Sequence, residues 1–391
     1  MKIFNRSIRI IHRLGAFFLI SLAAASTLRA QPSRVVSESD RLFYSAIELV
    51  DAGQFEQARE LLRDGEQRFP KNSTFPYELA YILYLEKNYA ESQRILLRII
   101  DAPDASDRFY QLLGNTYDLL GNSSKAIEIY EQGLEHFPES GPLYLERGIM
   151  AAMADDVSTA VGYWEQGIAN APWFSSNYFH AARSYMGSIN PGWGLIYGEI
   201  FVNLEPNTKR TDYIRGMMFD TWDNVLHVEH KSKDETSAIS LGGISIFSAI
   251  SMSIDPTTER ALMPFEMLIQ RSLAMAAIPL LLTGNDTLTI AGLHDVRKRF
   301  IGDWYRDTAA SRYFAIELFE RQRKLEELGL FETYDHLIYS TTATAAEADP
   351  WLEKNEKKIA VLHEWMSRNP IAADTSVAFS RIRLKGMPIP R

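Results

Sequence analysis

Two histidines and a glutamate stand close together in His227-Val-Glu-His230, and this is the one cluster in the sequence that is typical of a metal site. Histidines three residues apart share one face of a helix, where they could ligate zinc together with Glu229. No third ligand follows at a usual spacing, and Lys231 and Lys233 come directly after. We therefore expect solvated side chains here, and we predict no metal site and no cofactor.

Other catalytic patterns are missing from the sequence. It contains no cysteine, which excludes thiol nucleophiles, thiolate metal sites and disulfides. Neither a Gly-x-Ser-x-Gly nucleophile elbow nor a glycine-rich phosphate loop followed by lysine occurs. Asp303 and Asp307 are four residues apart, but the start of a capped helix explains them better than an acid pair does. We predict no catalytic residues.

The composition is that of a globular protein. Of the 391 residues, 46% are hydrophobic and 23% are charged, and the length suits two or three domains. The net charge is −9, whereas a protein that binds phosphate backbones needs a basic surface. We therefore predict no nucleic-acid partner.

Residues 1–30 have the pattern of a signal peptide. Lys2, Arg6, Arg9 and Arg13 precede an uncharged apolar run of 12 residues from Leu14 to Ala25. Such a run suits a signal peptide and is short of the ~20 residues that span a bilayer as a helix. An uncleaved membrane anchor is the alternative.

Small residues allow cleavage after Ala25 or after Ala30. Cleavage after Ala30 removes five basic residues and no acidic one, which takes the net charge from −9 to −14. We expect an exported protein of the periplasm or cell envelope of a Gram-negative bacterium, with no stable membrane insertion after cleavage.

A period of 34 residues runs from Ser39 to Pro206. Prolines recur in this register at Pro70, Pro138, Pro172 and Pro206, and Pro103 lies one residue from the missing position. With each proline at position 32 of a unit, small residues fall at position 8 and at position 20 of every unit. The ten are Ala46, Ala80, Gly114, Gly148 and Ala182, and Ala58, Ser92, Ala126, Ala160 and Gly194.

The spacing has a physical explanation. Two antiparallel helices pack closely only where small side chains let their backbones approach, as positions 8 and 20 would. The proline ends the second helix, because it donates no backbone hydrogen bond and disfavours a helical residue before it. This pattern resembles the tetratricopeptide repeat (TPR) over residues 39–206.

The resemblance implies an all-α fold, with a TPR-type α-solenoid of about five helix pairs. Amphipathic patterns at Asp303–Leu328, Glu353–Ser367, Thr257–Leu268 and Arg271–Leu282 predict a mostly helical C-terminal domain, the last helix being interrupted by Pro279. We divide the chain into a signal peptide (1–30), a linker (31–38), five repeats (39–206), a C-terminal domain (207–370) and an extended tail (371–391).

Two further segments bear on this division. Ile196–Arg210 resembles a group of exported bacterial TPR proteins with a helical C-terminal region. Thr236–Ile254 has 19 residues without a charge, but six serines and two glycines favour a buried helix or helix pair over a membrane span. Its alternation at Ile250–Ile254 leaves a strand open.

The resemblance also implies a concave groove lined by the first helix of each pair. The positions that would face a partner carry aromatic, arginine and amide side chains, which are frequent in interfaces. They are Tyr77, Tyr81, Tyr84, Arg108, Gln111, Asn115, Phe179 and Arg183, with Asp118 and Met186 beside them. The tyrosines could instead be core, since their spacing forms one helical stripe.

One variety of TPR holds a partner's C-terminal carboxylate with lysines and asparagines. The corresponding positions here offer Asn115 and no lysine, so this clamp is not supported. We expect a non-enzymatic scaffold or adaptor that binds a protein or peptide in the groove. The alternative is a hydrolase-like enzyme with its active site in the C-terminal domain and repeats that recruit its substrate.

Overall fold

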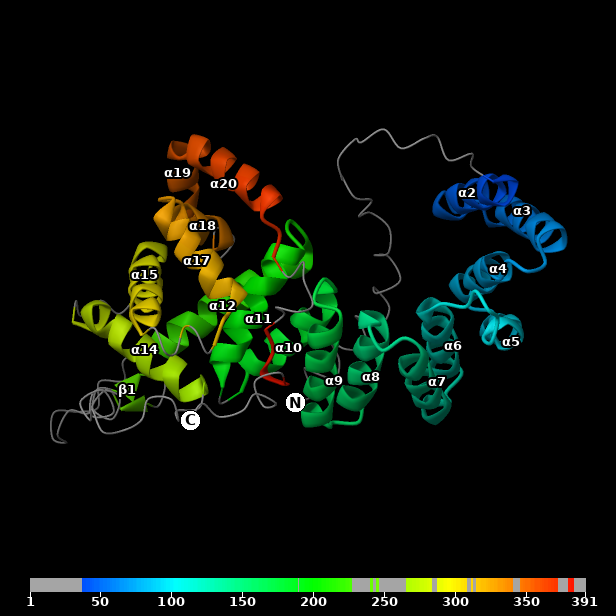
Figure 1. Cartoon of the computed structure of the whole chain (residues 1–391), viewed down its shortest axis with the longest axis horizontal. Helices are drawn as coiled ribbons and strands as arrows, with labels where there is room; N and C mark the ends of the chain where they lie inside the picture. Colours follow the sequence, from blue (N-terminus) through cyan, green and yellow to red (C-terminus); the bar gives the residue numbers. More distant parts are fainter. Residues whose placement is uncertain are drawn as a thin grey trace. The chain divides into compact units, whose positions relative to one another are not determined.

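The computed structural model describes residues 37–188, 190–226, 240–241, 244–245, 265–282, 287–307, 311, 314–339, 345–371 and 379–382. The predicted signal peptide and the His227–His230 cluster lie outside these residues. The chain is all-α and forms two compact units, one up to Tyr163 and the other from Trp164 onwards (Figure 1).

The first unit is built from antiparallel helix pairs that follow one another along the chain. The helices are α2 (Glu38–Asp51), α3 (Phe55–Arg68), α4 (Thr74–Leu85), α5 (Tyr89–Ile99), α6 (Asp107–Leu119), α7 (Ser123–His136), α8 (Gly141–Met153) and α9 (Val157–Asn170), and the division between the units falls within α9.

The predicted close approach of the paired helices is confirmed. All ten small residues at positions 8 and 20 are buried. The Ser92 hydroxyl on α5 donates a hydrogen bond of 2.8 Å to the Ala80 carbonyl on α4. This contact joins position 20 to position 8, so small side chains are required where the two backbones meet.

The prolines also act as predicted. Pro70, Pro138, Pro172 and Pro206 each lie two residues beyond the end of a helix, which is where a residue without an N–H donor is tolerated. Neighbouring pairs are joined by side chains about one repeat apart, as in the 2.6 Å bond from the Ser140 hydroxyl to Asp107.

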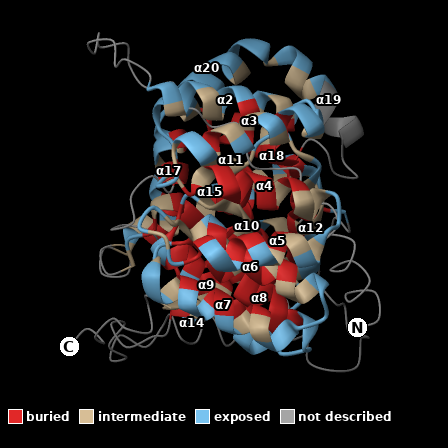
Figure 2. Cartoon of the chain, turned by 90° about the vertical axis from the view of Figure 1, so that its right-hand side faces the viewer, coloured by how far each residue is buried: buried red, intermediate tan, exposed pale blue. Residues whose placement is uncertain are grey.

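The second unit starts within α9 and continues with the fifth helix pair and then with helices of a different pattern. They are α10 (Ser175–Met186), α11 (Pro191–Leu204), α12 (Lys209–Leu226), α14 (Phe265–Leu281), α15 (Ile290–Arg306), α17 (Glu317–Glu327), α18 (Phe331–Tyr339), α19 (Ala345–Lys354) and α20 (Glu356–Arg368). Helix α11 is largely buried (Figure 2), with Trp193 and Phe201 among its covered side chains.

A two-residue antiparallel ladder, β1 (Ser240–Leu241) with β2 (Ile244–Ser245), lies in the uncharged segment 236–254. The rest of that segment is outside the described residues. Among the helices that the structure describes, none is both long and apolar enough to cross a bilayer.

The single helix predicted over Asp303–Leu328 is wrong. Helix α15 ends at Arg306 and α17 begins at Glu317, so Asp303 lies in the last turn of a helix and does not start one. In one continuous helix, Trp304 and Phe319 would stand about 22 Å apart along the axis. Here their rings meet edge to face at 5.3 Å, because the chain turns back and packs α17 against α15.

The predicted interruption at Pro279 is also wrong. Helix α14 continues through this residue to Leu281, and the proline in its last turn removes one backbone hydrogen bond without ending the helix. Of the helix predicted over Thr257–Leu268, only the part from Phe265 is described, and it belongs to α14. The helix predicted over Glu353–Ser367 corresponds to α20 with the end of α19.

Candidate partner-binding groove

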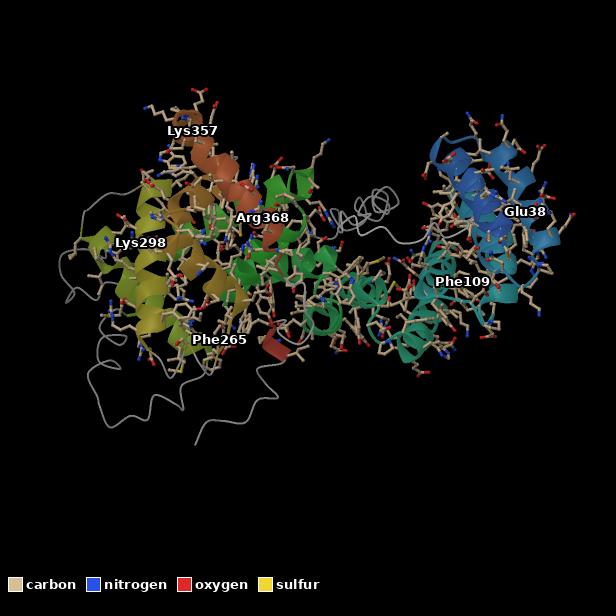
Figure 3. The ribbon with its side chains drawn as sticks, turned by 45° about the horizontal axis from the view of Figure 1, so that its top comes forward. Glu38, Phe109, Phe265, Lys298, Lys357 and Arg368 are labelled. Atoms are coloured by element: carbon tan, nitrogen blue, oxygen red, sulfur yellow. The ribbon has the colours of Figure 1, made fainter. Side chains whose placement is uncertain are left out.

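The first helices α4 and α6 carry six of the eight predicted groove residues. Tyr81, Tyr84, Gln111 and Asn115 are half-buried and Arg108 is exposed. Tyr77 is buried, with 5% of its surface exposed, so it supports the surface from beneath and offers little area to a partner. Figure 3 shows Phe109, which Tyr77 contacts, among the helices of this unit.

A cation lies over an aromatic pair at this surface. The rings of Tyr77 and Phe109 stack at 4.7 Å, and the Arg108 guanidinium lies 4.9 Å from the centre of the Tyr77 ring. Such contacts hold an arginine in place while leaving its edge free to donate hydrogen bonds.

Arg108 also approaches a buried acid that the sequence analysis did not single out. Glu78 is 3% exposed, and its carboxylate lies 3.6 Å from the Arg108 guanidinium. Burial raises the pKa of Glu78 to about 7, an effect that Arg108 partly opposes and Asp51 reinforces. Only the register of the repeat could have indicated this residue, since it directly follows Tyr77.

The two outer tyrosines form the aromatic part of the surface. Burial raises the pKa of both Tyr81 and Tyr84, so their hydroxyls stay protonated and can donate. The Tyr84 ring contacts Tyr89 edge to face at 5.6 Å. These rings combine an apolar body with a polar end, as interface tyrosines often do.

The amide residues of the third repeat are partly engaged within the chain. Gln111 donates a 3.0 Å hydrogen bond to Glu146 on α8, and Asn115 accepts one from the Tyr130 hydroxyl. Asp118 accepts from the Ser123 hydroxyl. A partner that contacted these amides would use their remaining donors and acceptors.

The last two predicted groove residues lie on α10, in the second unit. Phe179 is buried, 3% exposed, and packs against Phe201 at 5.3 Å. Arg183 is half-buried, and its guanidinium lies 5.3 Å from the Phe179 ring and 5.4 Å from the Tyr213 ring. Tyr213 is 49% exposed and was not predicted. Arg183 and Tyr213 are therefore the accessible pair here.

The second unit also contains a buried charged network. The Arg297 guanidinium donates to both oxygens of Glu199, at 2.7 and 2.8 Å, and lies 2.8 Å from Asp335. Gln322 donates to Glu199 at 2.7 Å, and His294 bonds Asp335 at 2.7 Å. Such a network is stable only when each buried polar group in it has a hydrogen-bond or ion-pair partner.

A cavity of about 50 Å³ adjoins this network. Apart from Glu199, Arg297 and Gln322, its walls are mostly apolar side chains of α11, α14, α15 and α17. The polar atoms that line it are bonded to one another, which favours a structural role for them. No group of three metal-ligating side chains occurs in the part of the chain that the structure describes.

Comparisons with known proteins identify the repeat. Two family models described as tetratricopeptide repeat match residues 49–116 and 107–139. No curated protein matches the chain.

Two solved structures resemble the chain at low identity. A thermophilic TPR protein of Thermus thermophilus is 16% identical, with a TM-score of 0.38, over 47% of this chain and 98% of that one. A TPR protein of Parabacteroides merdae is 14% identical, with a TM-score of 0.36, over 78% and 98%. The matched family models and the confirmed helix packing identify tetratricopeptide repeats in the N-terminal region of this chain, and repeats of this kind form protein–protein interaction modules.

Proposed function

We propose that the protein is a non-enzymatic scaffold or adaptor that binds a peptide or protein segment along the first helices of its repeats. The observation that carries this proposal is the row formed by Tyr81, Tyr84 and Arg108. The two tyrosines on α4 are half-buried and the arginine on α6 is exposed, next to buried residues such as Ile82 and Phe109. Tyrosine and arginine are the residues most often found as binding anchors.

The geometry suits an extended partner segment. Tyr81 and Tyr84 lie one turn apart on α4, and Arg108 stands on the next first helix with its guanidinium held over Tyr77. A partner would contact apolar rings and a fixed cation together, which gives both affinity and register.

The test begins with crosslinking and recovery of partners from the native envelope. Affinity for a recovered partner is then measured with Tyr81→Ala and with Arg108→Ala, each expected to weaken binding by about 1–2 kcal/mol. Arg94→Ala is the matched control, because Arg94 lies on the second helix α5 and pairs with Glu91. It should leave the affinity unchanged.

Melting curves of the same variants distinguish a residue that contacts the partner from a residue that belongs to the hydrophobic core. Arg108→Ala should lower the melting temperature only modestly, because its side chain is 50% exposed although it is the cation beside the buried Glu78. A large loss of stability in Tyr81→Ala combined with normal affinity in Arg108→Ala would contradict the groove and leave a purely structural solenoid.

The location is part of the proposal and rests on the first thirty residues alone. A basic start, an apolar run of 12 residues and small residues at Ala25 and Ala30 support export to the periplasm or cell envelope. Mass spectrometry of the protein from the envelope fraction should show a chain that begins at Ser26 or Gln31. A mature chain that retains Met1 would contradict it.

The enzymatic alternative gains no specific support from the described residues of the second unit. It would require convergent acids and histidines in a cavity large enough for a substrate. The cavity beside Glu199 measures about 50 Å³, and the Glu199 carboxylate already accepts from Arg297 and Gln322.

A further inference from the structure

A four-residue segment near the C-terminus, residues 379–382, is held in a recess of the second unit. The recess is formed by Glu165 on α9, Tyr185 on α10, Trp193 and Tyr197 on α11, and Phe265 on α14, and we call it the Glu165 socket. Figure 3 shows the labelled Phe265 close to this short red segment.

The polar half of the socket binds a guanidinium. Glu165 is fully buried, and Arg381 donates to its two oxygens through Nε at 3.1 Å and Nη2 at 2.9 Å. The hydroxyls of Tyr185 and Tyr197 also donate to Glu165, each at 3.0 Å. A buried carboxylate that receives a two-pronged arginine and two hydroxyls is a built site for that cation.

The apolar half binds an aromatic ring. Phe379 stacks on Trp193 at 5.5 Å and meets the edge of Phe265 at 5.2 Å, and 8% of its surface remains exposed. Trp193 is fixed by its own hydrogen bond of 3.1 Å to Glu266. The ring pocket and the carboxylate are therefore spaced for an aromatic residue and an arginine two positions apart.

The segment contacts the socket as a peptide ligand would. Arg381 is separated from Glu165 by 216 residues of sequence, and the segment belongs to none of the helices α2 to α20. The Arg381 backbone N–H is also used, donating to the Tyr197 hydroxyl at 3.0 Å. Two side-chain anchors and one backbone contact are enough to fix direction and register.

We propose that the Glu165 socket is a peptide-binding site for segments in which an arginine follows an aromatic residue by two positions. Its occupant is the chain's own segment 379–382. The attachment is intramolecular, so a tethered segment at millimolar effective concentration excludes a free peptide of the same sequence. When the tethered copy cannot dock, the socket binds such a peptide in trans.

The main test uses the full-length chain with Phe379→Ala and Arg381→Ala combined. The probe is a labelled synthetic peptide that covers residues 375–386, and binding is followed by fluorescence anisotropy. We expect the peptide to bind the double variant at least ~10-fold more tightly than the unaltered chain, which its own segment occupies. Equal binding to both, or no binding to a folded double variant, would overturn the proposal.

Two controls test the chemistry of the site. A peptide with Arg381→Lys should bind the double variant at least ~10-fold more weakly, because an ammonium cannot reach both oxygens of Glu165 as a guanidinium does. Adding Glu165→Gln to the double variant should reduce binding of the original peptide by a similar factor. If lysine and arginine peptides bound alike, the two-pronged contact would be wrong.

A measurement on the unaltered chain keeps the proposal testable even if the double variant fails to fold. Hydrogen exchange should show the Arg381 amide at least ~10-fold slower than in the free peptide, because it is bonded to Tyr197. If the Arg381 amide exchanged as fast as in the free peptide, the segment would not be docked in the socket. If light scattering showed dimers that depend on concentration, the segment in the socket would come from a second copy of the chain. That result would contradict the proposal that the chain's own segment occupies it.

Discussion

The two units differ in the polar contacts that stabilise each of them. In the first unit, ion pairs join neighbouring repeats near the surface, as between Glu66 and Arg98, which are 32 residues apart. In the second unit, Arg297 reaches Glu199 over 98 residues, and both side chains are almost fully buried. Local, exposed pairs contribute little each, whereas removal of one partner from a buried pair is severe.

The difference follows from how each unit is built. A repeat contacts mainly its neighbours, so its stability is close to a sum of similar local terms. The second unit folds helices of unlike pattern around α11, and its buried charges must find partners far along the chain. Mutations should therefore have graded effects in the first unit and severe effects in the second.

The largest effect is expected from Arg297→Ala. It leaves Glu199 and Asp335 buried without their cation, which should lower the unfolding free energy by about 3–5 kcal/mol. Urea denaturation followed by circular dichroism measures it. A loss below about 1 kcal/mol would mean that this network is not closed in solution, and the contrast between the units would disappear.

Glu78→Gln tests a strongly perturbed acid of the first unit. The pKa of Glu78 is about 7 in the fold against an ordinary 4.5, so between these values the folded chain binds more protons than the unfolded chain. The unaltered protein therefore loses stability as pH rises from 4.5 through 7. Relative to it, the glutamine variant should gain on the order of 2–3 kcal/mol between about pH 4 and about pH 8.

Glu91→Gln is the control for that pH series. The Arg94 hydrogen bond lowers the pKa of Glu91, so the ionised carboxylate stabilises the folded chain as pH rises. Relative to the unaltered protein, the Glu91→Gln variant should therefore lose stability as pH rises, whereas Glu78→Gln should gain it. Melting temperatures measured across the pH range in both variants give the comparison. Parallel curves would show that Glu78 is not buried as described.

Gly114→Ala tests the close approach of the paired helices α6 and α7. A Cβ atom at this position would lie 2.2 Å from the Tyr130 ring, whose hydroxyl is bonded to Asn115. Overpacking should cost about 1–3 kcal/mol. Gly162→Ala is the matched control in the same unit, since its Cβ meets nothing within 4 Å and should be neutral or slightly stabilising. Equal melting temperatures for the two variants would contradict the packing.

Arg98→Ala should have the smallest effect and completes the comparison with Arg297. Its side chain is 56% exposed and pairs with Glu66 at 2.6 Å. We expect a change within about 0.5 kcal/mol, reduced further at high salt. If Arg98→Ala lowered the unfolding free energy as much as Arg297→Ala in the same urea experiment, the exposure of an ion pair would not explain the difference between the two units.

The sequence by itself determined the repeat architecture. Small residues such as Ser92 and prolines such as Pro138 recur every 34 residues. They recur because in each repeat the two helix backbones must approach closely and the second helix must end at the same position. The sequence also predicted Tyr81, Tyr84 and Arg108 as residues of one binding surface, which the affinity measurements on their alanine variants test. It did not show that Tyr77 and Phe179 are buried, since exposure depends on the helices that pack above them.

The tertiary structure alone decided the second unit. Helix α15 ends at Arg306 and Trp304 packs against Phe319 of α17, and no periodicity in the sequence indicates that the chain turns back there. The partner of Glu199 is Arg297 and the partner of Glu165 is Arg381, at separations of 98 and 216 residues. A single sequence carries local propensity, but it does not indicate which distant charge will neutralise a buried one, and that choice is made only when the helices pack.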